Sequence, residues 1–168
     1  MDPKLHALLD KQAITEVQAR YCRTLDWLDE AGLGSVFWPD AEIDYGFFVG
    51  SGEDFIPIVM QVEKSSERRW HNLTNLSIKL DGNEAEVECY GIAQSTSSLK
   101  GKKRDQIFGG RYLDCFEKRD DEWRISKRKF ILDWTQSFDH GVDAYREGRM
   151  SLPILDIREP GHPDYREL

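Results

Sequence analysis

The chain has 168 residues, of which 39% are apolar and 32% are charged, and its formal net charge is −8 at pH 7. This composition is typical of one soluble globular domain that is large enough to bury most of the surface of its unfolded form. It excludes a membrane span, because no apolar run approaches the roughly 20 residues that cross a bilayer, and it disfavours nucleic acid as a partner, because phosphate binding depends on clustered Lys and Arg.

The first predicted element is a long amphipathic helix from Leu5 to Leu28, where apolar residues recur at helical spacing, with Asp10 as a point where it could break. The residues before it alternate charge with apolar side chains and lack the apolar core of a secretory signal, so we expect a cytoplasmic protein. Two glycines end this helix, and residues 33–38 predict a short helical turn that Pro39 stops.

A strand is predicted next over residues 41–49, followed by a Gly-Ser-Gly turn. Residues 53–64 predict a third helix, with Pro57 in its first turn. From Arg69 onward the apolar period changes to two, which predicts four antiparallel strands. These strands cover residues 70–80, 85–95, 107–118 and 123–134, and a Ser-rich and Lys-rich loop separates the second from the third at residues 95–104.

Alternation in the first of these four strands is imperfect, because His71 and Leu73 have the opposite parity to Leu76 and Ile78. A one-residue slip near Asn75 reconciles them, and such bulges bend sheets near functional sites. Helices first and antiparallel strands afterward predict an α+β domain in which a curved sheet wraps around helices.

The pattern fades after Trp134, which places the domain at residues 1–136 and a C-terminal extension at residues 137–168. The extension contains apolar residues and prolines, so we expect it to pack on the domain or on a neighbouring subunit. Three cysteines are widely spaced, with no CxxC pair and no Cys/His cluster. Neither a disulfide framework nor a metal site is therefore predicted.

Two residues carry the strongest chemical signal, namely Asp26 near the end of the first helix and His71 in a strand. An imidazole oriented by a carboxylate is a general base that works near neutral pH without a metal or an organic cofactor. Asp26 as a solvated residue near a helix end, and His71 as a satisfied core histidine, are the plain alternatives. If the two meet in a pocket, the chain is a small cofactor-free enzyme.

Aromatic residues make up 11% of the chain. Phe108, Tyr112 and Phe116 share one face of a predicted strand. Tyr45 and Tyr112 are candidates, ahead of Tyr90, for donating a hydrogen bond to a substrate oxygen, since a buried phenol seeks a partner. A flat apolar or aromatic substrate suits this composition better than a sugar phosphate.

An ordered set of segments resembles the SnoaL-like branch of the NTF2-like superfamily, which includes hexachlorocyclohexane dehydrochlorinases and polyketide cyclases, with scytalone dehydratase as a relative. The resemblance spans about residues 5–136 and implies a cone, in which a strongly curved mixed or antiparallel sheet is closed by about three N-terminal helices around a mainly apolar pocket. Its segments are Tyr21 to Asp26, Phe37 to Glu42, Trp70 to Leu76, Arg111 to Arg119 and Trp123 to Arg128.

The resemblance implies roles for individual residues. His71 matches the base that removes a proton from carbon, and Asp26 matches the residue that fixes its tautomer. Arg128 matches an arginine that helps the leaving group depart, and its alternative is a solvated strand residue. Trp38 matches a pocket tryptophan, and its alternative is plain core. The predicted substrate-binding set is Tyr21, Trp38, Tyr45, Phe108 and Tyr112.

The predicted function is that of a cofactor-independent lyase for a small aromatic or apolar molecule. Its leaving group would be water, halide or a carbonyl fragment such as formaldehyde from a lignin-derived diarylpropane. The alternatives are an isomerase or cyclase of the same fold, and a non-catalytic scaffold such as the small subunit of a ring-hydroxylating dioxygenase. The resemblance also implies a homodimer or homotrimer.

Overall fold

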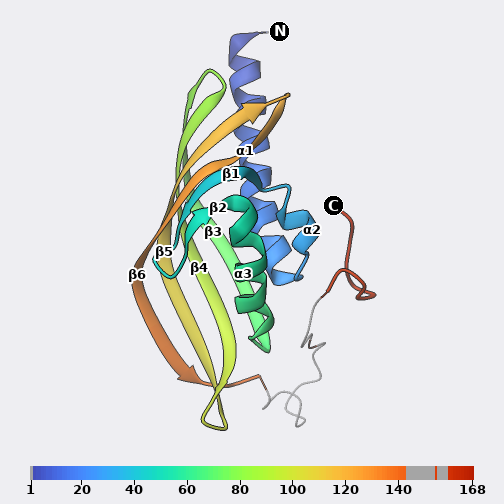
Figure 1. Cartoon of the computed structure of the whole chain (residues 1–168), viewed down its shortest axis with the longest axis vertical. Coiled ribbons are helices and arrows are strands. Elements are labelled where there is room, and N and C mark those ends of the chain that lie inside the picture. Colours follow the sequence, from blue (N-terminus) through green and yellow to red (C-terminus); the bar gives the residue numbers. More distant parts are fainter. Residues whose placement is uncertain (1, 143–153, 155–158) are drawn as a thin grey trace.

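The computed structural model describes residues 2–142, 154 and 159–168. Three helices and six strands follow one another along these residues (Figure 1). In chain order they are α1 (Pro3–Asp26), α2 (Glu30–Leu33), β1 (Phe37–Asp44), β2 (Val49–Ser51), α3 (Gly52–Lys64), β3 (Arg68–Asp81), β4 (Glu84–Leu99), β5 (Lys102–Arg119) and β6 (Glu122–Asp139).

The strands form one curved, unclosed sheet with the order β2-β1-β6-β5-β4-β3. β1 runs parallel to β6, and every other neighbouring pair is antiparallel. The helices lie together on one side of this sheet (Figure 1). The predicted α+β fold with a mixed sheet around N-terminal helices is therefore confirmed. None of the described helices has the length and apolar character that crossing a membrane requires.

Helix α1 begins at a capped end, because the side chain of Asp2 accepts a hydrogen bond from the Lys4 amide and Pro3 occupies the first turn. It continues through Asp10 without the predicted break. The Asp10 carboxylate accepts a hydrogen bond of 2.8 Å from Nε1 of Trp123, which ties the middle of the helix to β6. Its buried stripe includes Ile14, Val17, Tyr21 and Leu25.

The helical turn predicted over residues 33–38 is wrong at its C-terminal half. Phe37 and Trp38 begin β1, and Phe37 pairs with Ile125 of β6 in parallel register. Phe37 is 1% exposed, so the pairing buries a large aromatic side chain that an isolated helical turn would leave in water. The strand predicted over residues 41–49 is also divided, because Gly46 turns the chain with φ +75° between β1 and β2.

Helix α3 is capped by Ser51, whose hydroxyl accepts a hydrogen bond from the Asp54 amide. It begins at Gly52, so Pro57 is its sixth residue and lies in the second turn rather than in the predicted first turn. Proline there removes the bond to the Glu53 carbonyl. Both residues are exposed, so water can satisfy that carbonyl, and the apolar face of the helix holds the turn in place.

The predicted slip in β3 is confirmed. The register between β3 and β4 shifts between Thr74 and Ser77, and Asn75 has a φ of +51°. The shift turns Leu76 and Ile78 to the face that His71 and Leu73 already share, because side chains alternate strictly on either side of a bulge. Leu73, Leu76 and Ile78 all pack against the core as a result.

Replacing Asn75 with valine is expected to lower the free energy of unfolding by about 1–2 kcal/mol, because a branched side chain is strained at a positive φ. Asn75→Gly relieves the backbone and is expected to stay close to wild type. Urea unfolding of the three proteins measures the difference. Equal stability of the valine and glycine variants would show that the bulge relaxes without cost.

The four long strands extend further than predicted, and the loop expected at residues 95–104 is wrong. β4 and β5 pair up to Leu99 and Lys102, joined by a tight turn in which Lys100 and Gly101 have φ values of +51° and +75°. Two such positive values are the geometry that matches the twist of a hairpin. β6 likewise reaches Asp139, past the predicted domain boundary at residue 136.

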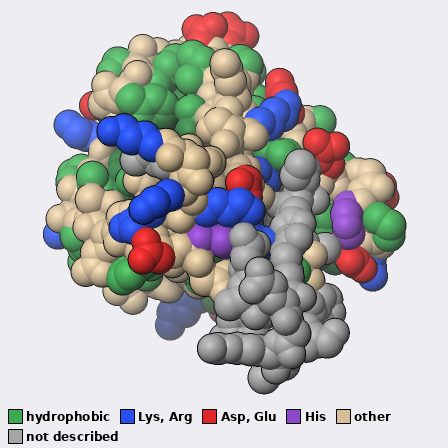
Figure 2. Space-filling model, turned by 90° about the horizontal axis from the view of Figure 1, so that it is seen from below, with side chains coloured by type: hydrophobic (Ala, Val, Ile, Leu, Met, Phe, Trp, Pro, Cys, Tyr) green, Lys and Arg blue, Asp and Glu red, His purple; other side chains and the backbone are tan. Residues whose placement is uncertain are grey.

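Charged side chains of both signs gather at the end of the molecule that holds the β4–β5 turn (Figure 2). Lys103 contacts Glu67 at 2.9 Å, and Arg104 pairs with Asp139. Exposed pairs of this kind contribute little to stability. They make the rim of the sheet polar at this end.

The end of the predicted C-terminal extension packs on the domain itself. The Tyr165 hydroxyl donates a hydrogen bond of 2.9 Å to Asp29, and the Tyr165 ring contacts Trp27 with a centroid distance of 5.4 Å. The predicted packing of residues 143–153 and 155–158 lies outside the described residues. A contact between the extension and a neighbouring subunit stays a prediction.

The outer face of the sheet carries several half-exposed apolar side chains. Ile92 of β4 and Trp134 of β6 lie on either side of Gly109 in one row across the sheet and are 39% and 47% exposed. Trp70 of β3 is 44% exposed. An exposed apolar patch is typical of an interaction surface. The homodimer or homotrimer stays a prediction.

Candidate active site

A cavity of about 540 Å³ lies between the helices and the inner face of the sheet. Its size and mainly apolar lining are typical of pockets for small molecules. Four predicted substrate-binding residues, Tyr21, Tyr45, Phe108 and Tyr112, line it together with His71. The other lining residues include Phe47, Val59, Val62, Glu63, Ala93, Gln106, Phe130 and Leu132.

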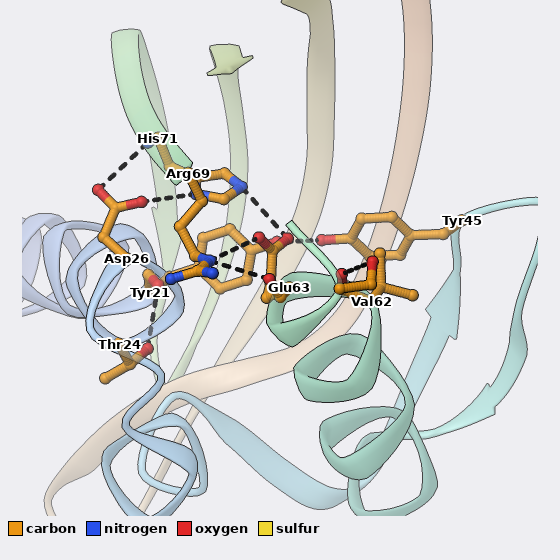
Figure 3. A network of polar contacts seen from close by, with 9 residues as sticks. Tyr21, Thr24, Asp26, Tyr45, Val62, Glu63, Arg69 and His71 are labelled. Carbon is orange, nitrogen blue, oxygen red and sulfur yellow. Dashed lines mark hydrogen bonds and ion pairs between the residues drawn. The ribbon is translucent and has the colours of Figure 1, made fainter. Parts of the chain in front are cut away.

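The structure brings Asp26 and His71 together at the wall of this cavity (Figure 3). Asp26 is the last residue of α1, and its Oδ1 lies 3.0 Å from Nδ1 of His71. Its Oδ2 accepts a second hydrogen bond of 3.2 Å from the backbone amide of His71. One carboxylate thus fixes both the ring and the strand that carries it.

This contact defines what each nitrogen of His71 can do. An ionised carboxylate only accepts hydrogen bonds, so this contact favours the tautomer with the hydrogen on Nδ1, which leaves the lone pair on Nε2. The His71 side chain is only 9% exposed, which shields the pair from water. A carboxylate contact of this kind orients an imidazole, which is one requirement of a general base.

Sequence reasoning missed Glu63, which lies on the other side of the imidazole. Its Oε1 is 3.7 Å from Nε2 of His71, and its side chain is 13% exposed. Burial raises the pKa of Glu63, while His71 and Arg69 oppose this rise. A signal was present in the sequence, because Phe55, Val59 and Glu63 follow one another at intervals of four on the buried face of α3.

A pair of phenols also lines the cavity. The hydroxyls of Tyr21 and Tyr45 lie 2.6 Å apart (Figure 3). The Tyr45 ring stacks on Phe55 with a centroid distance of 4.8 Å. Burial raises the pKa of Tyr21, Tyr45 and Tyr112, so these phenols keep their protons. One hydroxyl of the pair can donate to the other and the second can donate to a ligand.

Arg128 is neither a solvated strand residue nor exposed to the cavity. It is 0% exposed, and its guanidinium donates two hydrogen bonds, of 2.8 and 2.7 Å, to Asp114. It also donates to Oε1 of Gln18 at 2.7 Å. The guanidinium lies 4.3 Å from the ring centroid of Tyr21 and 4.5 Å from that of Tyr112.

Arg128 is not among the residues that line the cavity, so its predicted contact with a leaving group stays a prediction. The guanidinium lies over the rings of Tyr21 and Tyr112, so its positive charge acts on phenols that line the cavity. Its electrostatic effect lowers the pKa of Tyr21, Tyr45 and Tyr112 against the effect of burial. Phenols backed by a cation are better hydrogen-bond donors.

Trp38 is separate from the cavity, and its predicted substrate contact is wrong. Its Nε1 donates a hydrogen bond of 3.1 Å to the Glu117 carbonyl, and its ring centroid lies 4.8 and 4.7 Å from the guanidinium groups of Arg119 and Arg124. The pairing of β1 with β6 places it there. Trp38 contributes to packing at that edge of the domain.

Metal-binding side chains do not gather in the part of the chain that the structure describes. No group of three or more His, Cys, Asp or Glu residues there has an arrangement that could hold a metal ion. The three cysteines are free, and Cys115 is exposed while Cys89 is buried. The titratable side chains that line the cavity are Glu63, His71 and the three tyrosines Tyr21, Tyr45 and Tyr112.

A curved sheet that folds against helices around an apolar cavity, with an imidazole and a carboxylate at its wall, defines the class of cone-shaped α+β domains. Residues 6–129 match the model of the SnoaL-like domain. The chain therefore belongs to the SnoaL-like domain family, as its ordered segments indicated. No curated protein matches the sequence significantly.

Solved structures show the same fold. A type 2 hexachlorocyclohexane dehydrochlorinase is 19% identical with a TM-score of 0.74, over 89% of this chain and 97% of that one. A type 3 enzyme from Novosphingobium barchaimii is 21% identical with a TM-score of 0.69, over 90% and 99%. A proposed scytalone dehydratase from Novosphingobium aromaticivorans is 19% identical with a TM-score of 0.70, over 94% and 97%.

Proposed function

We propose that the chain is a lyase that needs no cofactor and eliminates a small group from an aromatic or similarly flat apolar substrate. His71 removes a proton from carbon through Nε2, and Asp26 holds the imidazole and stabilises the imidazolium that forms. The observation that carries this proposal is the double contact between Asp26 and His71 at the wall of an apolar cavity.

The phenol pair supplies the second requirement of such a reaction. Removing a proton beside a carbonyl or an aryl ring places negative charge on the substrate, and that charge needs a hydrogen-bond donor. The hydroxyls of Tyr21 and Tyr45 line the same cavity as His71. We assign them to the substrate oxygen that becomes more negative in the transition state.

Isomerisation or cyclisation is the second candidate, because proton abstraction by the same base also begins those reactions. The position of Glu63 supports this candidate, since a second proton-carrying group can return a proton to a different carbon. A non-catalytic scaffold is less well supported, because burying a polar Asp–His pair costs free energy of folding that a scaffold has no reason to spend.

Asp26→Asn tests the proposal. We expect kcat to fall by about 10²-fold or more. The reason is geometric: Asp26 accepts from two N–H groups of His71 through two oxygens, and an amide has only one accepting oxygen. Mass spectrometry of products from aryl alcohols, aryl-propane diols and halogenated rings, with chelator-treated protein, identifies the substrate class and measures the loss.

The matched control is Asp133→Asn, which removes an exposed carboxylate that pairs with Arg111. It is expected to retain wild-type turnover. Wild-type turnover that disappears with the chelator, or an Asp26→Asn protein as active as the control, would contradict the proposal. Product masses separate elimination from isomerisation, since an isomer keeps the mass of its substrate.

A further inference from the structure

Two carboxylates face the imidazole of His71 from opposite sides (Figure 3). Asp26, from the end of α1, contacts Nδ1, and Glu63, from the last turn of α3, faces Nε2. Both Glu63 and His71 line the cavity. The base proposed above therefore shares its substrate-facing side with a second group that can carry a proton.

The distance between Glu63 and His71 sets their relation in the free protein. At 3.7 Å, Oε1 and Nε2 are further apart than a hydrogen bond allows. The two side chains are therefore not hydrogen-bonded to each other, and both can contact atoms of a ligand in the cavity. A short movement of either side chain closes the gap, so a proton can pass between them once the ligand has left.

The surroundings of Glu63 favour its protonated form more than water does. Burial raises the pKa of this carboxyl. The groups that oppose the rise are His71 and Arg69 of β3, and Asp26 of α1 adds to it. The Arg69 Nε lies 3.9 Å from Oε2 and also donates to the Glu63 backbone carbonyl at 3.0 Å, so it fixes the end of the helix.

We propose that Glu63 is the general acid of this site and that the leaving group is a hydroxyl, which departs as water. This inference rests on the proposed elimination by His71. The substrate class is a β-hydroxy carbonyl or a similar compound. Its carbonyl group acidifies the hydrogen on the adjacent carbon, and the hydroxyl is bonded to the carbon after that one. Hydroxide is a poor leaving group unless it is protonated, whereas halide leaves without a proton.

The proton and electron pairs balance within the site. Nε2 of His71 takes the proton from carbon, the C–H pair becomes the new double bond, and the C–O bond breaks with its pair going to oxygen. Glu63 gives its proton to that oxygen, so water leaves. Imidazolium and carboxylate then face each other, and the proton passes from Nε2 to Glu63. Both groups return to their starting states without net exchange of protons with solvent.

Glu63→Gln tests the assignment with two probes that share one carbon skeleton. The first is the aldol adduct of acetone with benzaldehyde, and the second is the same ketone with its hydroxyl replaced by para-nitrophenoxide, which leaves without protonation. We expect the variant to lose about 10²-fold in kcat on the hydroxy ketone. We expect elimination of nitrophenoxide to stay near the wild-type rate. Glu67→Gln, which changes a surface glutamate paired with Lys103, is the matched control.

Equal losses on both probes would overturn the assignment, because they would make Glu63 a positioning residue. A Glu63→Gln variant that eliminates water from the hydroxy ketone at the wild-type rate would overturn the assignment as well. Exchange of the C–H hydrogen in D₂O, catalysed by wild type, tests the His71 base separately from Glu63. If wild type converts neither probe, difference infrared spectroscopy of wild type against Glu63→Gln at neutral pH decides. A protonated carboxyl band supports the acid, and its absence overturns it.

Discussion

Replacing His71 with glutamine is expected to lower kcat by about 10³-fold, the range that a positioned general base contributes. Glutamine has nearly the reach of histidine and can donate a hydrogen bond to Asp26, so the end of α1 keeps a partner. It cannot accept a proton at neutral pH. The loss is therefore expected in kcat and in C–H exchange with D₂O, while substrate binding changes little.

The measurement pairs turnover with exchange, so that a failure of the chemical step is distinguished from a failure of product release. His6→Gln is the control, because His6 is exposed on the first turns of α1 and is distant from the cavity. Thermal unfolding establishes that the His71 variant folds. A folded His71→Gln protein that exchanges and eliminates at the wild-type rate would remove His71 as the base and point to Glu63 in its place.

Replacing Asp114 with leucine is expected to destabilise the protein by about 3–5 kcal/mol, because it leaves the charge of Arg128 buried without its partner. Asp114 and Arg128 have side chains that are 0% exposed, and Gln18 hydrogen-bonds to both. No water reaches the guanidinium to replace the carboxylate. Urea unfolding, with the midpoint and slope fitted together, measures this change.

The double variant Asp114→Leu with Arg128→Met separates stability from function. Apolar residues of similar volume often replace a buried ion pair without loss, so the double variant is expected to recover most of the stability. Its turnover is expected to remain below that of wild type, because the cation behind Tyr21 and Tyr112 is gone. Recovery of both stability and full activity would limit Arg128 to a packing role.

Several features of the fold follow from the chain alone. Helical spacing defined α1 and the buried face of α3, and alternation defined the four long strands, since a residue's neighbours in sequence determine which face it shares. The same alternation indicated the bulge at Asn75, because two apolar sets of opposite parity cannot both face the core without one. The ordered segments identified the family, and with it the carboxylate and the imidazole that meet at the cavity.

Only the tertiary structure decided what each face meets. Phe37 and Trp38 read locally as the end of a helix, but pairing of β1 with β6, about ninety residues apart in the chain, makes them a strand. That pairing removes Trp38 from the cavity, and the β5–β6 register sets Arg128 behind the tyrosines beside Asp114. Glu63 faces His71 because the chain turns from the end of α3 directly into β3, where Arg69 donates a hydrogen bond to the Glu63 carbonyl. Sequence periodicity determines which side chains are buried. The residues that a buried side chain contacts come from distant segments of the chain, and the local pattern does not encode them.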